Sequence, residues 1–262
     1  MAATTTGAKV ALVTASSAGL GAATVRALAA NFRVVVNYHS RKEKADEVVA
    51  AASAVPAQYK VDDSASQPRF HIIQADVTKR SEIERLVKET VATMGRLDVV
   101  VSNTGWTRLT HFLDLEQQVN EDDWDRCFAA NVKSHLWLLY AAKPHLSASP
   151  EGGAFVTVAS LAGVRATGSS LPYSVTKAAE IHLTKGLATI CGKSVRCNSV
   201  SPGLMLTEWG SQFPADKIQA SKDKSLLKDL AAVEDVAEQI KALVLSKSIT
   251  GQNIVIDGGI AV

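Results

Sequence analysis

The fold is decided by the stretch Lys9-Val10-Ala11-Leu12-Val13-Thr14-Ala15-Ser16-Ser17-Ala18-Gly19-Leu20-Gly21-Ala22-Ala23. Its first six residues, 9–14, predict a short buried strand, and a helix is expected to begin near Gly19. The turn between them contains only small residues. A strand, a tight turn and a helix N-terminus together form a cradle for a dinucleotide pyrophosphate, because free backbone N–H groups and the helix dipole favour an anion. Taken alone, the segment also fits an ordinary strand-to-helix turn, so the rest of the chain must decide.

A second pattern lies near the middle of the chain, where Tyr173 and Lys177 are four residues apart and Ser160 follows the apolar run 154–158. On a helix, positions i and i+4 share one face, so the ammonium group can lie beside the phenol and stabilise its phenolate form. A serine hydroxyl at a strand end can hydrogen-bond the substrate oxygen that the tyrosine protonates or deprotonates. The Tyr-x-x-x-Lys spacing also arises by chance on surface helices.

The order of these and further motifs resembles the short-chain dehydrogenase/reductase family along nearly the whole chain. The family turn Thr-Gly-x-x-x-Gly-x-Gly corresponds to residues 14–21, with Ala15 in place of the first glycine. The other matching positions are Asp76-Val77, Ser102-Asn103-Thr104-Gly105, Asn131, Ser160, Tyr173, Lys177, Pro202-Gly203, Thr207 and the tail 251–259. The resemblance implies an α/β fold, a single-domain doubly wound Rossmann fold over residues 1–262 with a seven-stranded parallel sheet flanked by helices.

Hydrophobic runs place the strands near 9–14, 33–37, 70–74, 97–102, 153–159, 194–200 and 253–256. In open parallel sheets, ligands bind outside the carboxyl ends of the strands. We therefore expect the strand-terminal residues to meet at one edge of the sheet, namely Thr14, Asn37, Asp76, Asn103, Ser160 and Pro202.

The resemblance also implies the catalytic roles. Tyr173 exchanges a proton with the substrate oxygen, Ser160 orients that oxygen, and Lys177 assists the tyrosine and holds the nicotinamide ribose. Asn131 corresponds to the family asparagine that distorts its helix and holds a water linking the lysine to solvent, and its helix is expected near 122–146. A solvated helix asparagine is the alternative.

A nicotinamide cofactor is implied, and NADP(H) is favoured over NAD(H). No acid appears after the second strand before Glu43, whereas Ser40, Arg41 and Lys42 offer a hydroxyl and two cations to a 2′-phosphate. A helix start that is basic by chance is the alternative. The expected cofactor-binding residues are Thr14, Ser16, Ser17, Gly19, Leu20, Gly21, Asn37, Ser40, Arg41, Asp76, Val77, Asn103, Thr104, Gly105, Tyr173, Lys177, Pro202, Gly203 and Thr207.

The substrate is expected to be a small carbonyl compound or alcohol. Its contacts are expected in the segment from Gly203 to about Leu230, which forms the lid in the family, at Leu204, Met205, Trp209 and Phe213. Packing of these side chains on the core is the alternative. The likeness of residues 37–41 and of Gly258-Gly259 to 3-oxoacyl thioester reductases raises a second enzyme hypothesis. A nucleotide-binding regulator without turnover is a third hypothesis.

Ala15 is the clearest departure from the family turn. Glycine reaches positive φ without steric cost, whereas a Cβ there adds strain. We expect φ to be negative at Ala15, so that its methyl group points away and cofactor affinity changes little.

Composition narrows the remaining possibilities. The net charge of +2 implies no nucleic-acid partner, and no apolar stretch of membrane-spanning length is apparent. The three cysteines form no metal or disulfide pattern, and the six histidines, including His135, show no ligand spacing, so we expect no metal and surface or capping histidines. A cytoplasmic homodimer or homotetramer is expected, paired through helices near 122–146 and 173–190. The polar stretch 56–69, with Asp62 and Asp63, is expected to be a surface excursion.

Overall fold

The computed structural model describes residues 8–60 and 67–262, and its centre is one parallel sheet. The strand order is β3-β2-β1-β4-β5-β6-β7, and every neighbouring pair is parallel. The strands are β1 Val10–Val13, β2 Arg33–Tyr38, β3 Phe70–Gln74, β4 Val99–Ser102, β5 Gly153–Val158, β6 Val195–Pro202 and β7 Asn253–Ile256. The predicted seven-stranded doubly wound sheet is confirmed, because the hydrophobic runs were long enough to mark each buried strand.

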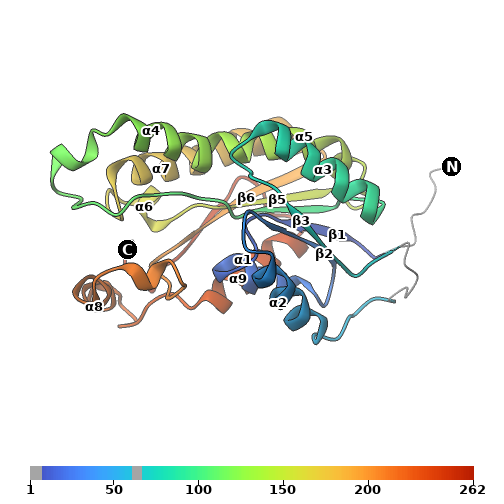
Figure 1. Cartoon of the computed structure of the whole chain (residues 1–262), viewed down its shortest axis with the longest axis horizontal. Helices are drawn as coiled ribbons and strands as arrows, with labels where there is room; N and C mark the ends of the chain where they lie inside the picture. Colours follow the sequence, from blue (N-terminus) through green and yellow to red (C-terminus); the bar gives the residue numbers. More distant parts are fainter. Residues whose placement is uncertain (1–7, 61–66) are drawn as a thin grey trace.

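Helices cover both faces of this sheet (Figure 1). One face carries α3 Arg80–Met94, α4 Glu121–Phe128, α5 Ser134–Ser147 and α7 Leu171–Cys191. The other carries α1 Gly19–Leu28, α2 Lys42–Ser53 and α9 Val233–Leu245. The remaining elements are the short α6 Leu161–Val164, α8 Ala215–Lys224, the 3-10 turns η1 Leu115–Gln118 and η3 Gly210–Gln212, and a turn η2 Ala129–Lys133 between α4 and α5. Within the described ranges, no helix combines the length and apolarity that a bilayer crossing requires.

The central strands are apolar on both sides, which is what a sheet covered by two helical layers requires. Along β1, Ala11 and Val13 pack into the cluster that includes α1 and α9, whereas Val10 and Leu12 pack into the cluster with α3 and α5. Side chains alternate between the two faces of a strand, so β1 is anchored in the core on both faces of the sheet. The turn that follows β1 therefore starts from a fixed position.

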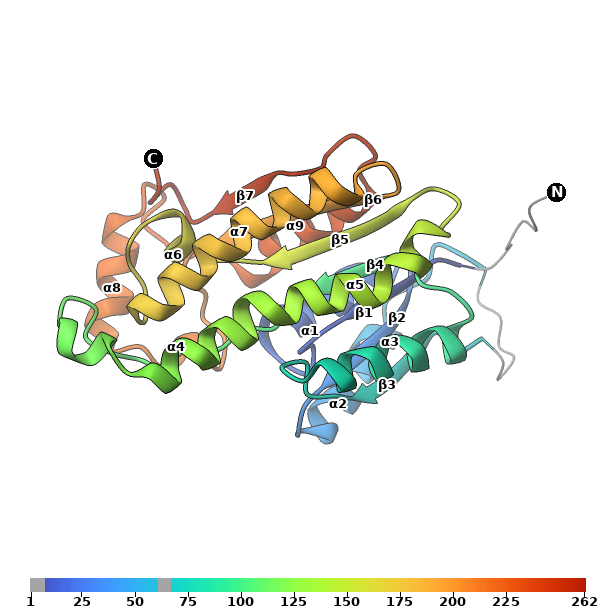
Figure 2. The same ribbon diagram turned by 90° about the horizontal axis from the view of Figure 1, so that it is seen from above.

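The expected long helix near 122–146 is interrupted. Residues Ala129–Lys133 form a π-helical turn, η2, between α4 and α5. Figure 2 shows α4 and α5 following one another along the same path, with α7 beside them. The distorted turn contains Asn131, at the position where the resemblance implied a distortion.

The expected polar excursion 56–69 is described only at its ends, since Asp62 and Asp63 lie outside the described residues. At those ends, the Tyr59 hydroxyl donates to the Phe32 carbonyl at 3.0 Å and an Arg69 nitrogen donates to the Ala29 carbonyl at 3.1 Å. Both ends are thus anchored next to the loop between α1 and β2.

Candidate active site

A cleft of about 1020 Å³ lies where the chain leaves β1, β4, β5 and β6. Its lining joins three groups of predicted residues. The catalytic candidates are Ser160, Tyr173 and Lys177; the cofactor candidates are Gly19, Leu20, Arg41, Asn103, Gly105, Pro202, Gly203 and Thr207; the substrate candidates are Leu204, Met205, Trp209 and Phe213. Segments separated by more than half of the chain therefore meet in one hollow.

The turn after β1 is held by two asparagines. The Ala15 amide donates to Asn37 Oδ1 at 2.9 Å, and Asn103 Nδ2 donates to the Ala15 carbonyl at 3.1 Å. Between these two bonds, Ala15 has a φ of +48°, in the left-handed region. The expectation of a negative φ is wrong here, because the two hydrogen bonds impose the conformation that the family turn reaches with glycine.

The start of α1 has the features of an anion site. Among the described residues, no side chain caps this helix, and Ala18, Gly19 and Leu20 face the cleft. Gly21 cannot carry a side chain, since a Cβ there would lie 2.6 Å from the Ala15 carbonyl oxygen and 2.7 Å from Asn103 Nδ2. Helix and turn thus pack closely and leave uncapped N–H groups at the cleft, which fits a dinucleotide pyrophosphate.

Several predicted cofactor residues face the protein instead of the cleft. Asn37 is 1% exposed, and its Nδ2 donates to the Ala75 carbonyl at 3.2 Å. The Ser16 hydroxyl donates to the Val13 carbonyl at 2.8 Å, and Thr14 Oγ1 accepts from the Asn103 amide at 3.0 Å. The Val77 side chain packs in the core beside α3. These side chains therefore support the edge of the cleft from inside the protein.

The other predicted cofactor positions lie at or near the rim. Thr104 Oγ1 donates to Thr14 Oγ1 at 3.2 Å, Ser17 is half-buried and Ser40 is exposed. Asp76 accepts from the Thr78 hydroxyl at 2.7 Å. Burial opposes ionisation of Asp76, but the hydrogen bonds from Thr78 outweigh it and lower its pKa.

The two cations expected to meet a 2′-phosphate are already paired. Arg41 Nη1 lies 2.8 Å from Glu208 Oε2, Lys44 contacts the same carboxylate, and Lys42 pairs with Asp46 at 2.8 Å. Hydrogen bonds from Lys44 and Arg41 lower the pKa of Glu208 to about 2. Glu208 follows the cofactor candidate Thr207 directly, and sequence reasoning missed it.

Ser160 and Tyr173 are presented by two helix starts. Ser160 is the N-cap of α6, where its Oγ accepts from the Ala162 amide at 3.1 Å, so its own O–H is left to donate. Tyr173 stands in the first turn of α7, whose N-cap Ser170 accepts from the Tyr173 amide at 3.3 Å. Both hydroxyl side chains line the cleft.

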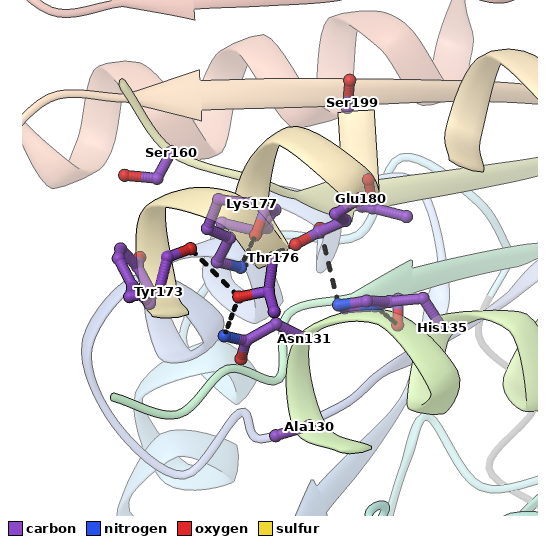
Figure 3. A network of polar contacts seen from close by, with 12 residues as sticks. Ala130, Asn131, His135, Ser160, Tyr173, Thr176, Lys177, Glu180 and Ser199 are labelled. Atoms are coloured by element: carbon purple, nitrogen blue, oxygen red, sulfur yellow. Dashed lines mark hydrogen bonds and ion pairs between the residues drawn. The ribbon is translucent and has the colours of Figure 1, made fainter. Parts of the chain in front are cut away.

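Lys177 lies one turn further along α7 and is 2% exposed. Its Nζ donates to the Val158 carbonyl at 2.7 Å and to Glu180 Oε2 at 2.8 Å, and it lies 5.7 Å from the centre of the Tyr173 ring. A Cβ on Gly105 would be 3.4 Å from this nitrogen, so the glycine keeps the ammonium group open to the cleft. Figure 3 shows the lysine between Tyr173 and Glu180 on the same helix.

Asn131 is fully buried under the loop after β4. Its Oδ1 accepts from the Trp106 amide at 2.7 Å, and its Nδ2 donates to the Trp106 carbonyl at 3.0 Å and to Thr176 Oγ1 at 2.9 Å. A Cβ on Gly105 would be 3.5 Å from Asn131 Oδ1, so this oxygen and Lys177 border the same small space. The asparagine connects η2 to both the loop and α7.

One expectation about the histidines is wrong. His135 is neither a surface nor a capping residue, because it is fully buried with its Nδ1 2.6 Å from Ser102 Oγ and its Nε2 3.5 Å from Glu180 Oε1. Sequence reasoning also missed Glu180. The available signals were spacings, since Glu180 follows Lys177 at i+3 and His135 follows Asn131 at i+4.

The lid segment borders the cleft with apolar side chains. The Trp209 and Phe213 rings meet edge to face with centroids 5.2 Å apart, and both line the hollow with Leu204. Met205 lines the cleft and also packs against the core. Cleft lining and core packing, which the sequence offered as alternatives, therefore both hold for this side chain.

The family model described as Enoyl-(Acyl carrier protein) reductase matches residues 14–261 of the chain. The chain belongs to the short-chain dehydrogenase/reductase family. As a short-chain dehydrogenase/reductase, it is an oxidoreductase acting on keto and hydroxyl groups, in a family that binds nicotinamide cofactors.

Individual members of the short-chain dehydrogenase/reductase family match along almost the full chain. A protein of the granaticin polyketide synthase of Streptomyces violaceoruber, named as ketoacyl reductase 2, is 37% identical over 96% of both chains. The 3-oxoacyl-[acyl-carrier-protein] reductase of Thermotoga maritima is 30% identical over 97% of this chain and 98% of its own. A short-chain dehydrogenase/reductase structure from Serratia marcescens superposes with a TM-score of 0.84 at 28% identity, covering 97% and 98% of the two chains.

Proposed function

We propose that this protein is an NADP(H)-dependent reductase or dehydrogenase that interconverts a carbonyl group and a secondary alcohol, with Tyr173 as proton donor and acceptor. The observation that carries the proposal is that Ser160, Tyr173 and Lys177 line the same cleft as the uncapped start of α1. One hollow then offers an anion site for the cofactor and proton-transfer groups for the substrate.

In this mechanism, the bound nicotinamide cofactor supplies the hydride for reduction. Ser160 donates its O–H to the substrate oxygen, because the Ala162 amide bonds to a lone pair of Ser160 Oγ and leaves the O–H free. Tyr173 gives its phenolic proton to the same oxygen, and the charged Lys177 ammonium stabilises the phenolate that remains. Asn131 fixes the η2 turn against α7 and borders the space beside Lys177 through which a proton can return.

The preference for NADP(H) rests on charge. Arg41 lines the cleft beyond β2, and Ser40 precedes it without a neighbouring acid in the sequence. A planar guanidinium binds phosphate oxygens well, while the Glu208 carboxylate that now holds it competes with a 2′-phosphate. NADPH binding is therefore expected to separate Arg41 from Glu208.

A second candidate function is reduction of a 3-oxoacyl thioester. It is favoured by the 30% identity to the Thermotoga maritima reductase and by Lys217 and Lys224, which line the cleft from α8. Of the other two basic residues in this region, Lys222 pairs with Asp229 at 3.2 Å, and Lys228 donates to the Asp223 carbonyl at 2.7 Å. In this second function, Lys217 and Lys224 are expected to meet an anionic carrier.

The experiment that tests these functions is NADPH oxidation measured against ketones, quinones, polyketide-like ketones and 3-oxoacyl thioesters, with NADH in parallel. Turnover of simple ketones with NADPH supports the first function. A strong preference for the thioesters supports the second. Cofactor binding without turnover of any panel member would contradict both and favour a nucleotide-binding regulator.

A further inference from the structure

The active-site lysine is attached to a buried chain of polar side chains that extends away from the cleft. Lys177 Nζ contacts Glu180 Oε2 at 2.8 Å, and Glu180 Oε1 lies 3.5 Å from His135 Nε2 (Figure 3). On the other side of the ring, His135 Nδ1 lies 2.6 Å from Ser102 Oγ. Glu180 and His135 are fully buried, and Ser102 is 1% exposed. This series of polar contacts therefore joins α7, α5 and β4 inside the protein.

A buried carboxylate is costly unless it is paired and hydrogen-bonded. Glu180 is one helical turn from Lys177 and faces the interior, at a position that an apolar side chain would fill without any such cost. Its Oε1 has no hydrogen-bond partner at normal distance among the described residues, so its pairing rests on Lys177 and the nearby His135 ring. Among the described residues, Lys177 is therefore the partner that the Glu180 carboxylate holds at hydrogen-bond distance.

The orientation of His135 follows from its two neighbours. A carboxylate only accepts hydrogen bonds, so the nitrogen that faces it, Nε2, carries a hydrogen. The Ser102 hydroxyl at Nδ1 then holds the ring in this orientation from β4. His135 thus presents the positive end of an N–H group to Glu180.

We propose that Glu180, supported by His135 and Ser102, is the positioning residue for Lys177: it fixes the ammonium group between the Val158 carbonyl and the cleft and keeps it charged while the cofactor is held. This inference rests on the proposed role of Lys177 in binding the nicotinamide ribose.

The charges agree with this geometry. Burial by itself would lower the pKa of Lys177, but the Glu180 carboxylate and the Tyr173 phenol outweigh it and raise that pKa above its ordinary value. Burial would raise the pKa of Glu180, but His135 and Lys177 outweigh it and lower that pKa. Both partners are held in their charged forms.

The remaining ionisable groups on the packed elements do not replace Glu180. On α7 the lysine faces Tyr173, and on α4 it faces Cys127, whose pKa burial raises to about 11. On β6, Arg196 donates to the Leu243 and Val244 carbonyls, and burial raises the pKa of Cys197 to about 12. The short α6 carries no ionisable side chain.

The first test measures the dissociation constant of NADPH by its fluorescence between pH 7 and pH 10. Glu180→Gln keeps the shape and an acceptor for Lys177 but removes the charge, so the largest effect that opposes burial is lost and the lysine pKa falls. We expect the ratio of the variant constant to the wild-type constant to rise by about tenfold over this range. Glu180→Asp, which keeps a carboxylate, should show a nearly constant ratio. A constant ratio for Glu180→Gln overturns the proposal.

The matched control is Thr184→Val. Thr184 is buried one turn further on α7 and shares a hydrogen bond of 3.0 Å with Thr157, so its loss perturbs packing without changing charge. Its ratio to wild type should not vary with pH. A pH-dependent ratio in this control would show that any packing defect in α7 gives the same effect, which overturns the assignment to Glu180.

The second test needs no cofactor and separates this inference from the proposed function. The raised lysine pKa contributes stability that is full below about pH 10.4 and is lost as the pH rises from there through the folded-state pKa. The lowered glutamate pKa contributes stability that is full above about pH 4.3 and is lost as the pH falls from there through the folded-state pKa. The urea midpoint of Glu180→Gln should therefore fall furthest below the wild-type midpoint between these limits. The difference between the two midpoints should narrow towards pH 11. If wild type binds no NADPH but this pattern holds, only the proposed function fails. A gap independent of pH overturns the ion-pair role itself.

If Glu180→Gln does not fold, the double variant Lys177→Met/Glu180→Met tests whether the unpaired lysine charge is the cause. Removing both charges together leaves no unpaired buried ion, so the double variant should fold where the single one does not. Failure of both to fold would show that Glu180 supports the fold independently of the lysine, contrary to the proposal.

Discussion

Glu208 and Arg41 are 167 residues apart in the chain, yet Glu208 Oε2 and Arg41 Nη1 are 2.8 Å apart. The carboxylate belongs to the segment after β6, and the guanidinium stands at the start of α2. The ion pair therefore joins the two sides of the proposed cofactor cleft, at the position where a 2′-phosphate would compete for the same cation.

Replacing Glu208 by Gln should tighten NADPH binding by about threefold to tenfold, because the cation is released from its exposed partner. The affinity for NADH should not change. Fluorescence titration with both cofactors measures the effect. Asp46→Asn is the control, since Asp46 pairs with Lys42 and leaves Arg41 untouched. Equal changes for NADPH and NADH would contradict the assignment of Arg41 to the 2′-phosphate.

Replacing Arg41 by Ala should weaken NADPH binding at least several-fold and leave NADH binding almost unchanged. Combined with Glu208→Gln, it should also abolish the gain expected from that substitution. The same titrations measure both variants. Equal affinities of the unmodified protein for NADPH and NADH would refute the proposed preference.

Tyr173→Phe should reduce turnover by about two to four orders of magnitude, because the phenolic proton donor is removed. NADPH affinity should remain nearly intact, since the ring stays in place. Lys177→Ala should impair both turnover and NADPH binding. Steady-state rates with the preferred substrate and a binding titration measure these effects, and substantial activity in Tyr173→Phe would rule out the mechanism.

Ala15→Gly should stabilise the protein by no more than about 1 kcal/mol. Relief of the positive-φ strain is partly offset by the greater freedom of glycine in the unfolded chain. NADPH binding should tighten by less than about tenfold, because Asn37 and Asn103 already hold the turn in the required shape. Urea unfolding and NADPH titration measure the two effects. Cofactor binding that appears only in the glycine variant would favour the hypothesis of a protein that keeps the fold without turnover.

The helices α4, α5 and α7 are expected to pair across subunits and give a dimer or a tetramer. Their outer surfaces carry large apolar side chains, including Tyr140 and Ile190, which are 64% and 76% exposed, and Ala178 leaves room for close approach. Light scattering over a range of concentrations measures the mass. A monomer at every concentration would refute this expectation.

The sequence by itself determined the sheet and the residues of the proposed active site. Each strand was marked by an apolar run, and the spacing of Ser160, Tyr173 and Lys177 located the proposed proton-transfer groups, because strand ends and helical turns convert spacing directly into position. It also indicated the distortion at Asn131 through the resemblance.

Only the tertiary structure decided the conformation of Ala15 and the partners of the charged groups. Asn37 at the end of β2 and Asn103 just after β4 impose a positive φ on Ala15, and Glu208 reaches Arg41 from the segment after β6. Likewise, His135 on α5 meets Glu180 on α7 although nothing in their spacing relates the two. Such pairings depend on which helices lie side by side over the sheet, and the local periodicity of the sequence does not predict that arrangement.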